Sequence, residues 1–90
     1  MAKLEQMFAT KDYETGYHYI KRGAYDSAII YFKDVIRKYP NAPKAREAYL
    51  RLLESYRAIN YREEAREVCD TMRQTYPTDS EVTRACPAPA

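Results

Sequence analysis

The chain has 90 residues and a formal net charge of +2, from 15 basic and 13 acidic side chains, a length that allows one small domain. The two signs alternate along the same segment, as in Glu47, Arg51, Glu54 and Arg57, whereas a nucleic-acid binder gathers basic side chains on one face. The sequence has no apolar run near the ~20 residues of a membrane-spanning helix and no signal-peptide pattern before its first predicted helix.

The first half of the chain predicts two helices. The composition favours helices, because Gly occurs only twice while Ala, Arg, Glu and Lys, which lose little freedom in a helix, are frequent. Nothing interrupts the segment from about Lys3 to Arg22, and Gly23 then supplies the left-handed residue that commonly ends a helix. A second helix is predicted from Asp26 to Tyr39, where Pro40 stops it. Its apolar residues follow helical spacing: Ala28, Ile29, Phe32, Val35, Ile36 and Tyr39.

The second half predicts two further helices and a short fifth one. Pro43 suits the first turn of a third helix, which continues to about Ile59 and ends in a turn at Asn60-Tyr61. The fourth helix carries Ala65, Val68, Cys69, Met72 and Tyr76 on one face. Beyond it, Thr78-Asp79-Ser80-Glu81 has the spacing of a capping box for a helix of barely two turns.

A repeat of 37 residues relates the two halves. Tyr39-Pro40 recurs as Tyr76-Pro77, and at the same offset Tyr19 pairs with Tyr56, Ala28 with Ala65, Phe32 with Cys69 and Val35 with Met72. Ala is small enough to let paired helices cross closely. The sequence therefore predicts an all-α chain of two antiparallel helix pairs, residues 1–39 and 40–77, followed by residues 78–90 as a short capping helix and a disordered Pro-rich tail.

The sequence offers no catalytic or metal-binding constellation. His18 lacks a neighbouring ligand at metal spacing, and Asp12 and Glu14 point to different helix faces without a nucleophile or an oriented base. Cys69 is expected to be a free, buried thiol on an apolar face, and Cys86 an exposed thiol open to adventitious intermolecular disulfides. We therefore predict no enzyme activity, no cofactor, no metal, no small-molecule substrate and no nucleic-acid partner.

The repeat resembles the tetratricopeptide repeat. The pattern is carried by Gly16, Tyr19, Gly23, Tyr25, Ala28, Phe32 and Pro40 in the first copy and by Tyr56, Ala65 and Pro77 in the second. Two departures are visible: the period exceeds the usual 34 residues of that repeat, and Leu53 stands where the first copy has Gly16. The resemblance implies an α–α superhelix whose first helices line a concave binding surface.

A narrower resemblance concerns one lipoprotein family. The run from Tyr17 to Tyr25, then Ala28-Ile29 and Tyr39-Pro40-Asn41, is similar to the C-terminal repeats of the BamD (YfiO) family of outer-membrane assembly lipoproteins. The resemblance covers about residues 3–78. It implies a C-terminal fragment in the periplasm, associated with the outer membrane through a lipid anchor that this chain lacks. In that family the C-terminal repeats dock on the last POTRA module of BamA, so the implied partner is a protein.

Two surfaces are candidates for partner binding, and Tyr and Arg are the residue types that most often anchor interfaces. The inner one carries Tyr13, Glu14, Tyr17, Ile20, Lys21, Glu47, Leu50, Arg51, Glu54 and Arg57, although Tyr13, Tyr17 and Ile20 could instead pack on a neighbouring helix of the full-length array. The outer one carries Ile30, Tyr31, Lys33, Asp34 and Arg37, which could equally be scattered exposed residues. The candidate partner-binding residues are Tyr13, Tyr17, Lys21, Tyr31, Lys33, Arg37, Arg51 and Arg57.

Other functions fit the same repeat. A generic tetratricopeptide adaptor of another cell-envelope or cytosolic complex is one alternative, and a regulatory piece of a larger enzyme is another. Because arrays usually need three or so repeats, the terminal apolar faces are expected to lack cover. These faces are Leu4, Met7 and Phe8 at one end and Val68 and Met72 at the other. We therefore expect marginal stability or self-association of the isolated chain.

Overall fold

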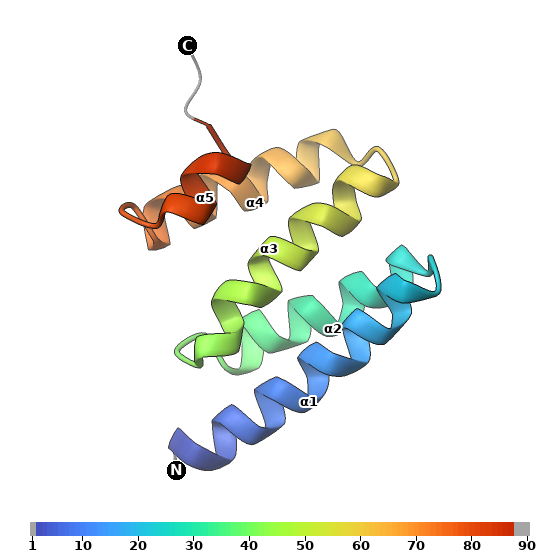
Figure 1. Cartoon of the computed structure of the whole chain (residues 1–90), viewed down its shortest axis with the longest axis vertical. Coiled ribbons are helices and arrows are strands. Elements are labelled where there is room, and N and C mark those ends of the chain that lie inside the picture. The colour runs from blue at the N-terminus through green and yellow to red at the C-terminus, as the bar shows by residue number, and fades with distance from the viewer. Residues whose placement is uncertain (1, 88–90) are drawn as a thin grey trace.

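The computed structural model describes residues 2–87, which contain five helices and no strand (Figure 1). The prediction of two antiparallel helix pairs and a short fifth helix is confirmed. The tail residues 88–90, expected to be disordered, lie outside the described residues. The helices are α1 (Ala2–Lys21), α2 (Tyr25–Lys38), α3 (Pro43–Ala58), α4 (Arg62–Thr75) and α5 (Ser80–Ala85).

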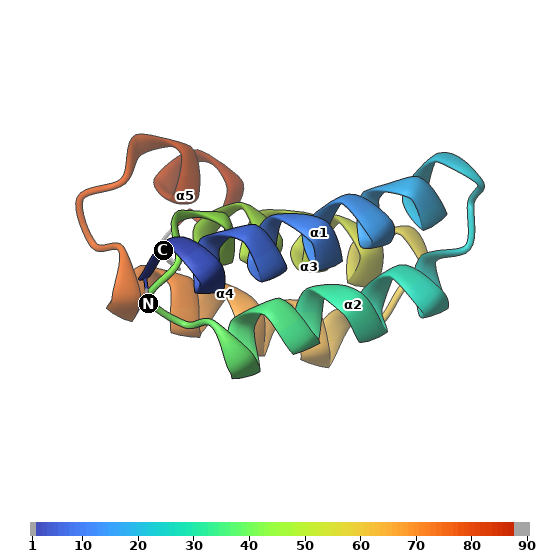
Figure 2. The same cartoon turned by 90° about the horizontal axis from the view of Figure 1, so that it is seen from below.

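The helices form two layers. Figure 2 shows α1, α3 and α5 in one layer and α2 and α4 in the other. Each helix packs on the next one in the chain, and α1 also packs beside α3 within its layer. The result is a slab with extents of 41 × 30 × 17 Å. One face of the slab is therefore made by the first helix of each pair, as in tetratricopeptide repeats.

The turn inside each helix pair has the same backbone geometry in both copies. Gly23 has φ 76° and Asn60, at the equivalent position, has φ 63°. The next residue then donates its N–H back to the preceding helix, from Ala24 to the carbonyl of Tyr19 at 2.9 Å and from Tyr61 to that of Tyr56 at 2.8 Å. Asn tolerates the left-handed region better than other residues with a side chain. The second turn can therefore do without glycine.

The core runs through both helix pairs. Ala28 and Ala65, predicted to lie between crossing helices, are 0% and 7% exposed. The largest fully buried side chains include Phe32, Leu53 and Met72. Because these residues belong to one continuous hydrophobic cluster, neither helix pair has a separate core.

A large residue and a small residue exchange places between the two copies. Gly16 on α1 lies against the ring of Phe32, and a Cβ added to it would be 2.9 Å from the Cε1 of that ring. In the second copy the equivalent positions hold Leu53 and Cys69. The large side chain thus comes from the second helix in one pair and from the first helix in the other. This exchange explains why the second copy departs from the repeat pattern at Leu53.

The two ends of the slab differ. Leu4, Met7 and Phe8 on α1 are 56%, 65% and 51% exposed, so the predicted uncovered face exists at this end. The prediction for the other end is wrong, because Val68 and Met72 are only 9% and 0% exposed. The short helix α5 packs on α4 and adds Val82 and Cys86 to the same core cluster.

The size exchange can be tested with a double-mutant cycle. Gly16→Leu forces a side chain into the ring of Phe32 and should lower the free energy of unfolding by about 1–3 kcal/mol. Phe32→Ala should cost about 3–5 kcal/mol by leaving a cavity. Combining the two should cost at least ~1 kcal/mol less than the sum, because the leucine fills the vacated space. Urea unfolding measures all three variants, and simple additivity would contradict the proposed packing.

Candidate interaction surfaces

A groove of about 410 Å³ opens on the layer of first helices. We call it the inner groove. Its lining comes from Tyr13 of α1, from the charged face of α3, and from Glu81, Arg84 and Ala85 of α5. Three of the residues predicted to bind a partner, Tyr13, Arg51 and Arg57, line this groove.

The aromatic residues at the α1 side of the inner groove are covered by cations. Tyr13 and Tyr17 stack with ring centroids 6.4 Å apart. The Nζ of Lys44 lies 4.7 Å from the centroid of Tyr13, while Arg51 Cζ and Lys21 Nζ lie 4.9 and 5.3 Å from that of Tyr17. These distances are in the range of cation–π attraction. The predicted residues Tyr13, Tyr17, Lys21 and Arg51 are therefore brought together, chiefly in contact with one another.

Tyr13 belongs to the core more than to the surface. It is 8% exposed and packs against Phe32 at a centroid distance of 5.6 Å. Its hydroxyl accepts a hydrogen bond from Arg51 Nε at 3.1 Å, and Arg51 also pairs with Glu54 at 2.9 Å. The pKa of Arg51 is raised, first by the bond to Tyr13, against its partial burial, and then by Glu54. Tyr13 therefore packs against α2 and α3 within this chain.

The start of α5 is held against α3 by an ion-pair cluster. Arg46 donates to both carboxylate oxygens of Asp79, and its Nη2 reaches Glu81 at 2.8 Å. Asp79 is also the N-cap, since its Oδ1 accepts from the N–H groups of Glu81 at 3.0 Å and Val82 at 3.2 Å. The predicted cap one residue earlier, at Thr78, is therefore wrong. Aspartate at position 79 can serve both the helix end and Arg46, which a threonine hydroxyl cannot do.

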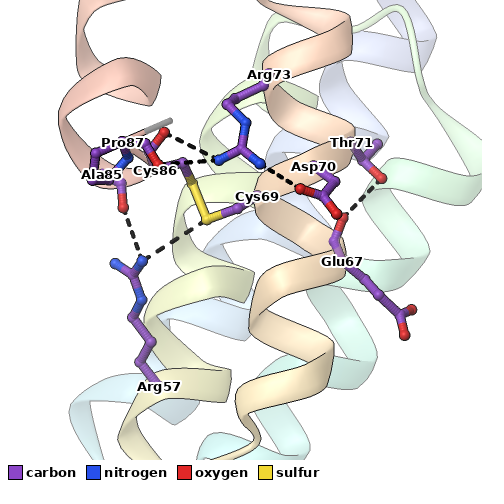
Figure 3. Close-up of a disulfide and its surroundings, with 9 residues drawn as sticks. All are labelled: Arg57, Glu67, Cys69, Asp70, Thr71, Arg73, Ala85, Cys86 and Pro87. Carbon is purple, nitrogen blue, oxygen red and sulfur yellow. Dashed lines mark hydrogen bonds and ion pairs between the residues drawn. A yellow bond between two sulfur atoms is a disulfide. The ribbon is translucent and has the colours of Figure 1, made fainter. Parts of the chain in front are cut away.

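The end of α5 is held by a disulfide between Cys69 of α4 and Cys86, with a Cα–Cα distance of 5.4 Å (Figure 3). Both cysteines are buried, at 6% and 1% exposed. The expectations of a free Cys69 and an exposed Cys86 are therefore wrong. The physical reason is that α5 packs on α4 and brings Cys86 next to Cys69.

Two arginines cap the carbonyl end of α5 around the disulfide (Figure 3). Arg57 Nη2 donates to the carbonyl of Ala85 at 2.9 Å and approaches Cys69 Sγ at 3.8 Å. Arg73 donates to the carbonyls of Cys86 at 3.3 Å and Pro87 at 3.4 Å. Cations are favourable where a helix presents its last carbonyls. Arg57, predicted to contact a partner, is thus engaged within the chain.

The repeat register contains a signal for this disulfide. At an offset of 37 residues, Cys69 corresponds to Phe32 and Cys86 to Tyr49. Phe32 is buried in the core and Tyr49 packs against it. Extending the register beyond Tyr76 would have placed both cysteines toward the core.

The outer side of α2 presents a different kind of surface, which we call the α2 face: Ile30, Tyr31, Lys33, Asp34 and Arg37. Ile30 is 61% exposed. Tyr31 is held by a stack on Tyr19 at a centroid distance of 5.5 Å. Lys33 is exposed, and the Arg37 side chain is 71% exposed while pairing with Asp34 at 2.7 Å. The face therefore combines exposed apolar surface, a positioned aromatic ring and basic side chains.

The second copy does not repeat the α2 face. The positions equivalent to Ile30, Lys33 and Arg37 on α4 hold Glu67, Asp70 and Gln74. The α4 surface is therefore acidic or neutral where the α2 face is apolar or basic. Structural packing alone would not require this difference, because these positions are exposed in both helices.

No helix within residues 2–87 is both long enough and apolar enough to cross a bilayer. No group of three His, Cys, Asp or Glu side chains in the same range could hold a metal ion.

Among known protein families, a family model described as YfiO, outer membrane lipoprotein, matches residues 1–79. No curated protein and no protein of solved structure matches the chain.

The ion pair at the start of α5 should give stability a particular pH dependence. Arg46 is the main cause that lowers the pKa of Asp79 to about 2, with the Val82 N–H assisting against burial, whereas an unfolded Asp titrates near ~3.9. The contribution of the Arg46–Asp79 ion pair to the free energy of unfolding is thus complete above about pH 4 and lost as the pH falls toward 2. Asp79→Asn keeps the capping oxygen but removes the charge. Its free energy of unfolding should fall less between pH 5 and pH 2.5 than that of the parent chain, and equal falls would contradict the pairing.

Reduction of the disulfide should loosen α5. The bond joins residues 17 apart in sequence, and a loop of this size contributes about 2–4 kcal/mol. Urea unfolding with and without dithiothreitol should differ by this amount for the parent chain. Cys86→Ser should match the reduced chain and show no response to dithiothreitol. Identical unfolding midpoints for oxidised and reduced parent chain would contradict the role of this bond.

Proposed function

Because the chain belongs to the YfiO family of outer-membrane lipoproteins, we propose that it is a non-catalytic docking module for a protein partner. The proposed partner is a periplasmic POTRA module of BamA, in the assembly of outer-membrane β-barrels. The proposed location is the periplasm, at the outer membrane. Family membership supports the non-catalytic role, and the exposed surfaces supply the candidate docking sites.

The observation that carries the proposal is Ile30, which is 61% exposed beside a stacked Tyr31. A single exposed apolar residue is common on protein surfaces, whereas an apolar residue next to an aromatic ring on one helix face forms a patch of the kind that can mark a binding site. Tyr31 already has its ring fixed by Tyr19, so little side-chain freedom is lost when it binds. Aromatic residues placed in this way are typical of interface hot spots.

Basic side chains give the α2 face a charge preference. Lys33 and Arg37 surround the apolar centre, and Asp34 is already paired with Arg37 and, at 3.9 Å, with Lys38. A partner with an acidic rim around an apolar patch would complement this arrangement and would associate faster at low salt. The α2 face is therefore proposed as the principal docking surface.

The inner groove is the second candidate within the same function. Leu50 lines it and is half-buried, and Tyr17, also half-buried, lies beside it against Tyr13 and Arg51. However, Tyr13 and Arg51 are tied to each other by a hydrogen bond. A partner would have to displace cations that already cover the aromatic rings. We therefore rank the inner groove below the α2 face.

Binding to purified periplasmic modules of BamA tests the proposal. Tyr31→Ala should weaken binding by about tenfold or more, the effect of losing a hot-spot aromatic residue, and Ile30→Ala should weaken it as well. Isothermal titration calorimetry gives the dissociation constants, and far-UV circular dichroism checks that the helices persist.

The repeat provides a matched control. Glu67→Ala changes the position on α4 that corresponds to Ile30 and should leave the affinity unchanged. Tyr17→Ala probes the inner groove in the same assay. If only Tyr17→Ala weakened binding, docking would occur at the inner groove. If the parent chain did not bind, the BamA assignment would be wrong.

A further inference from the structure

A second hollow, of about 530 Å³, lies beside the disulfide; it shares Arg57 with the inner groove and no residue with the α2 face. We call it the α4 slot. Its apolar floor includes Ala65 and the Cys69–Cys86 disulfide. Its sides include Arg57 from the end of α3, Tyr61 before α4, and Arg62, Arg66 and Arg73 along α4. Figure 3 shows Arg57 and Arg73 on opposite sides of the disulfide.

The repeat register indicates that this hollow has the position of a helix. In the first copy the equivalent face of α2 packs against α3, which has 16 residues. The equivalent helix on α4 is α5, which has only 6 residues and ends at Ala85, the counterpart of Ala48 in α3. The α4 slot begins where α5 ends. It therefore corresponds to the place of the second half of α3, Tyr49–Ala58, or nearly three helical turns.

The sides of the slot changed in charge relative to the first copy. Arg62, Arg66 and Arg73 occupy the positions of Tyr25, Ile29 and Ile36. With Arg57, the slot has four guanidinium groups against one carboxylate, Asp70, which pairs with Arg73. The side chains of Arg62 and Arg66 are exposed, and neither makes a hydrogen bond or ion pair with other residues in the range 2–87. An occupant must therefore supply negative charge where α3 supplies apolar surface.

We propose that the α4 slot binds an acidic amphipathic helix of a partner protein, about three turns long. Its small apolar residues would rest on Ala65 and the disulfide, and its carboxylates would pair with Arg62 and Arg66. Binding of a helix in a groove through an apolar strip and flanking charges is a common mode of recognition. This proposal is independent of the α2 face, which lies on another helix.

Two helical peptide probes can distinguish binding of a helix in the α4 slot from the alternative, in which the arginines of the slot only form a polar cap at the end of the helical array. Both are labelled, side-chain-stapled peptides based on residues 49–58, because a peptide of this length does not stay helical in water. The acidic probe carries Arg51→Glu and Arg57→Glu, and the basic probe carries Glu54→Lys. Fluorescence anisotropy against the full, oxidised chain should give a dissociation constant at least tenfold lower for the acidic probe.

Charge reversal locates the binding site. The chain with Arg62→Glu and Arg66→Glu should bind the acidic probe at least tenfold more weakly than the parent. The control chain, with Lys11→Glu and Arg22→Glu on and after α1, has the same net charge change and should bind like the parent. Circular dichroism and thermal melting establish that both variants are folded. The double variant Arg62→Gln with Arg66→Gln removes the two charges without reversing them and serves as a milder test in the same assay. Absence of binding by the acidic probe, or equal losses in the two reversed chains, would overturn the proposal and leave the arginines as an end cap.

Discussion

Each second helix in this chain depends on contact with the first helix of the unit that follows it. The helix α2 buries Phe32 and Val35 between α1 and α3. Within residues 2–87, the helix on the far side of α4 is α5, which has six residues. Here a covalent bond and charged groups supplement the limited packing: the disulfide at one end of α5, with Arg57 and Arg73, and Arg46 at the other. The clamp around α5 thus compensates for a short helix.

The same asymmetry separates surfaces that support the fold from surfaces proposed to bind partners. Arg57 and Tyr13 looked like partner-binding residues by their types, but the clamp and the core engage them. Ile30 remains exposed on α2, and Tyr31 beside it is partly exposed while one side of its ring stacks on Tyr19 of α1. Differences between the two repeat copies are the guide to function, because exposed positions that change character are not dictated by packing. This reasoning supports the α2 face. The α4 slot differs, because its exposed Arg66 stands at the position of Ile29, which is buried in the first copy.

Much of the fold could be predicted from local pattern, because helix spacing, Gly23, Pro43 and the buried Ala28 and Ala65 each reflect a constraint within one turn or crossing. Contacts made beyond the second copy were missed. Val68 and Met72 were predicted to be uncovered because two repeats are fewer than an array usually needs, a rule that takes no account of the cover that α5 gives. Cys86 seemed exposed because a Pro-rich tail suggested disorder. Asp79 was missed as the cap because its second role, pairing with Arg46, depends on a residue 33 positions away. Which predicted binding residues are accessible likewise depended on long-range contacts.

Native-state hydrogen exchange on the oxidised chain tests most directly whether α5 completes the second unit. If α5 completes the second unit, the amides of Val68, Cys69 and Met72 exchange only through global unfolding. Their free energy of opening then equals that of the amides of Phe32 and Val35. Exchange of the α4 amides at a much lower free energy, while α2 remains protected, would contradict it. The second unit would then be a frayed appendage on the first.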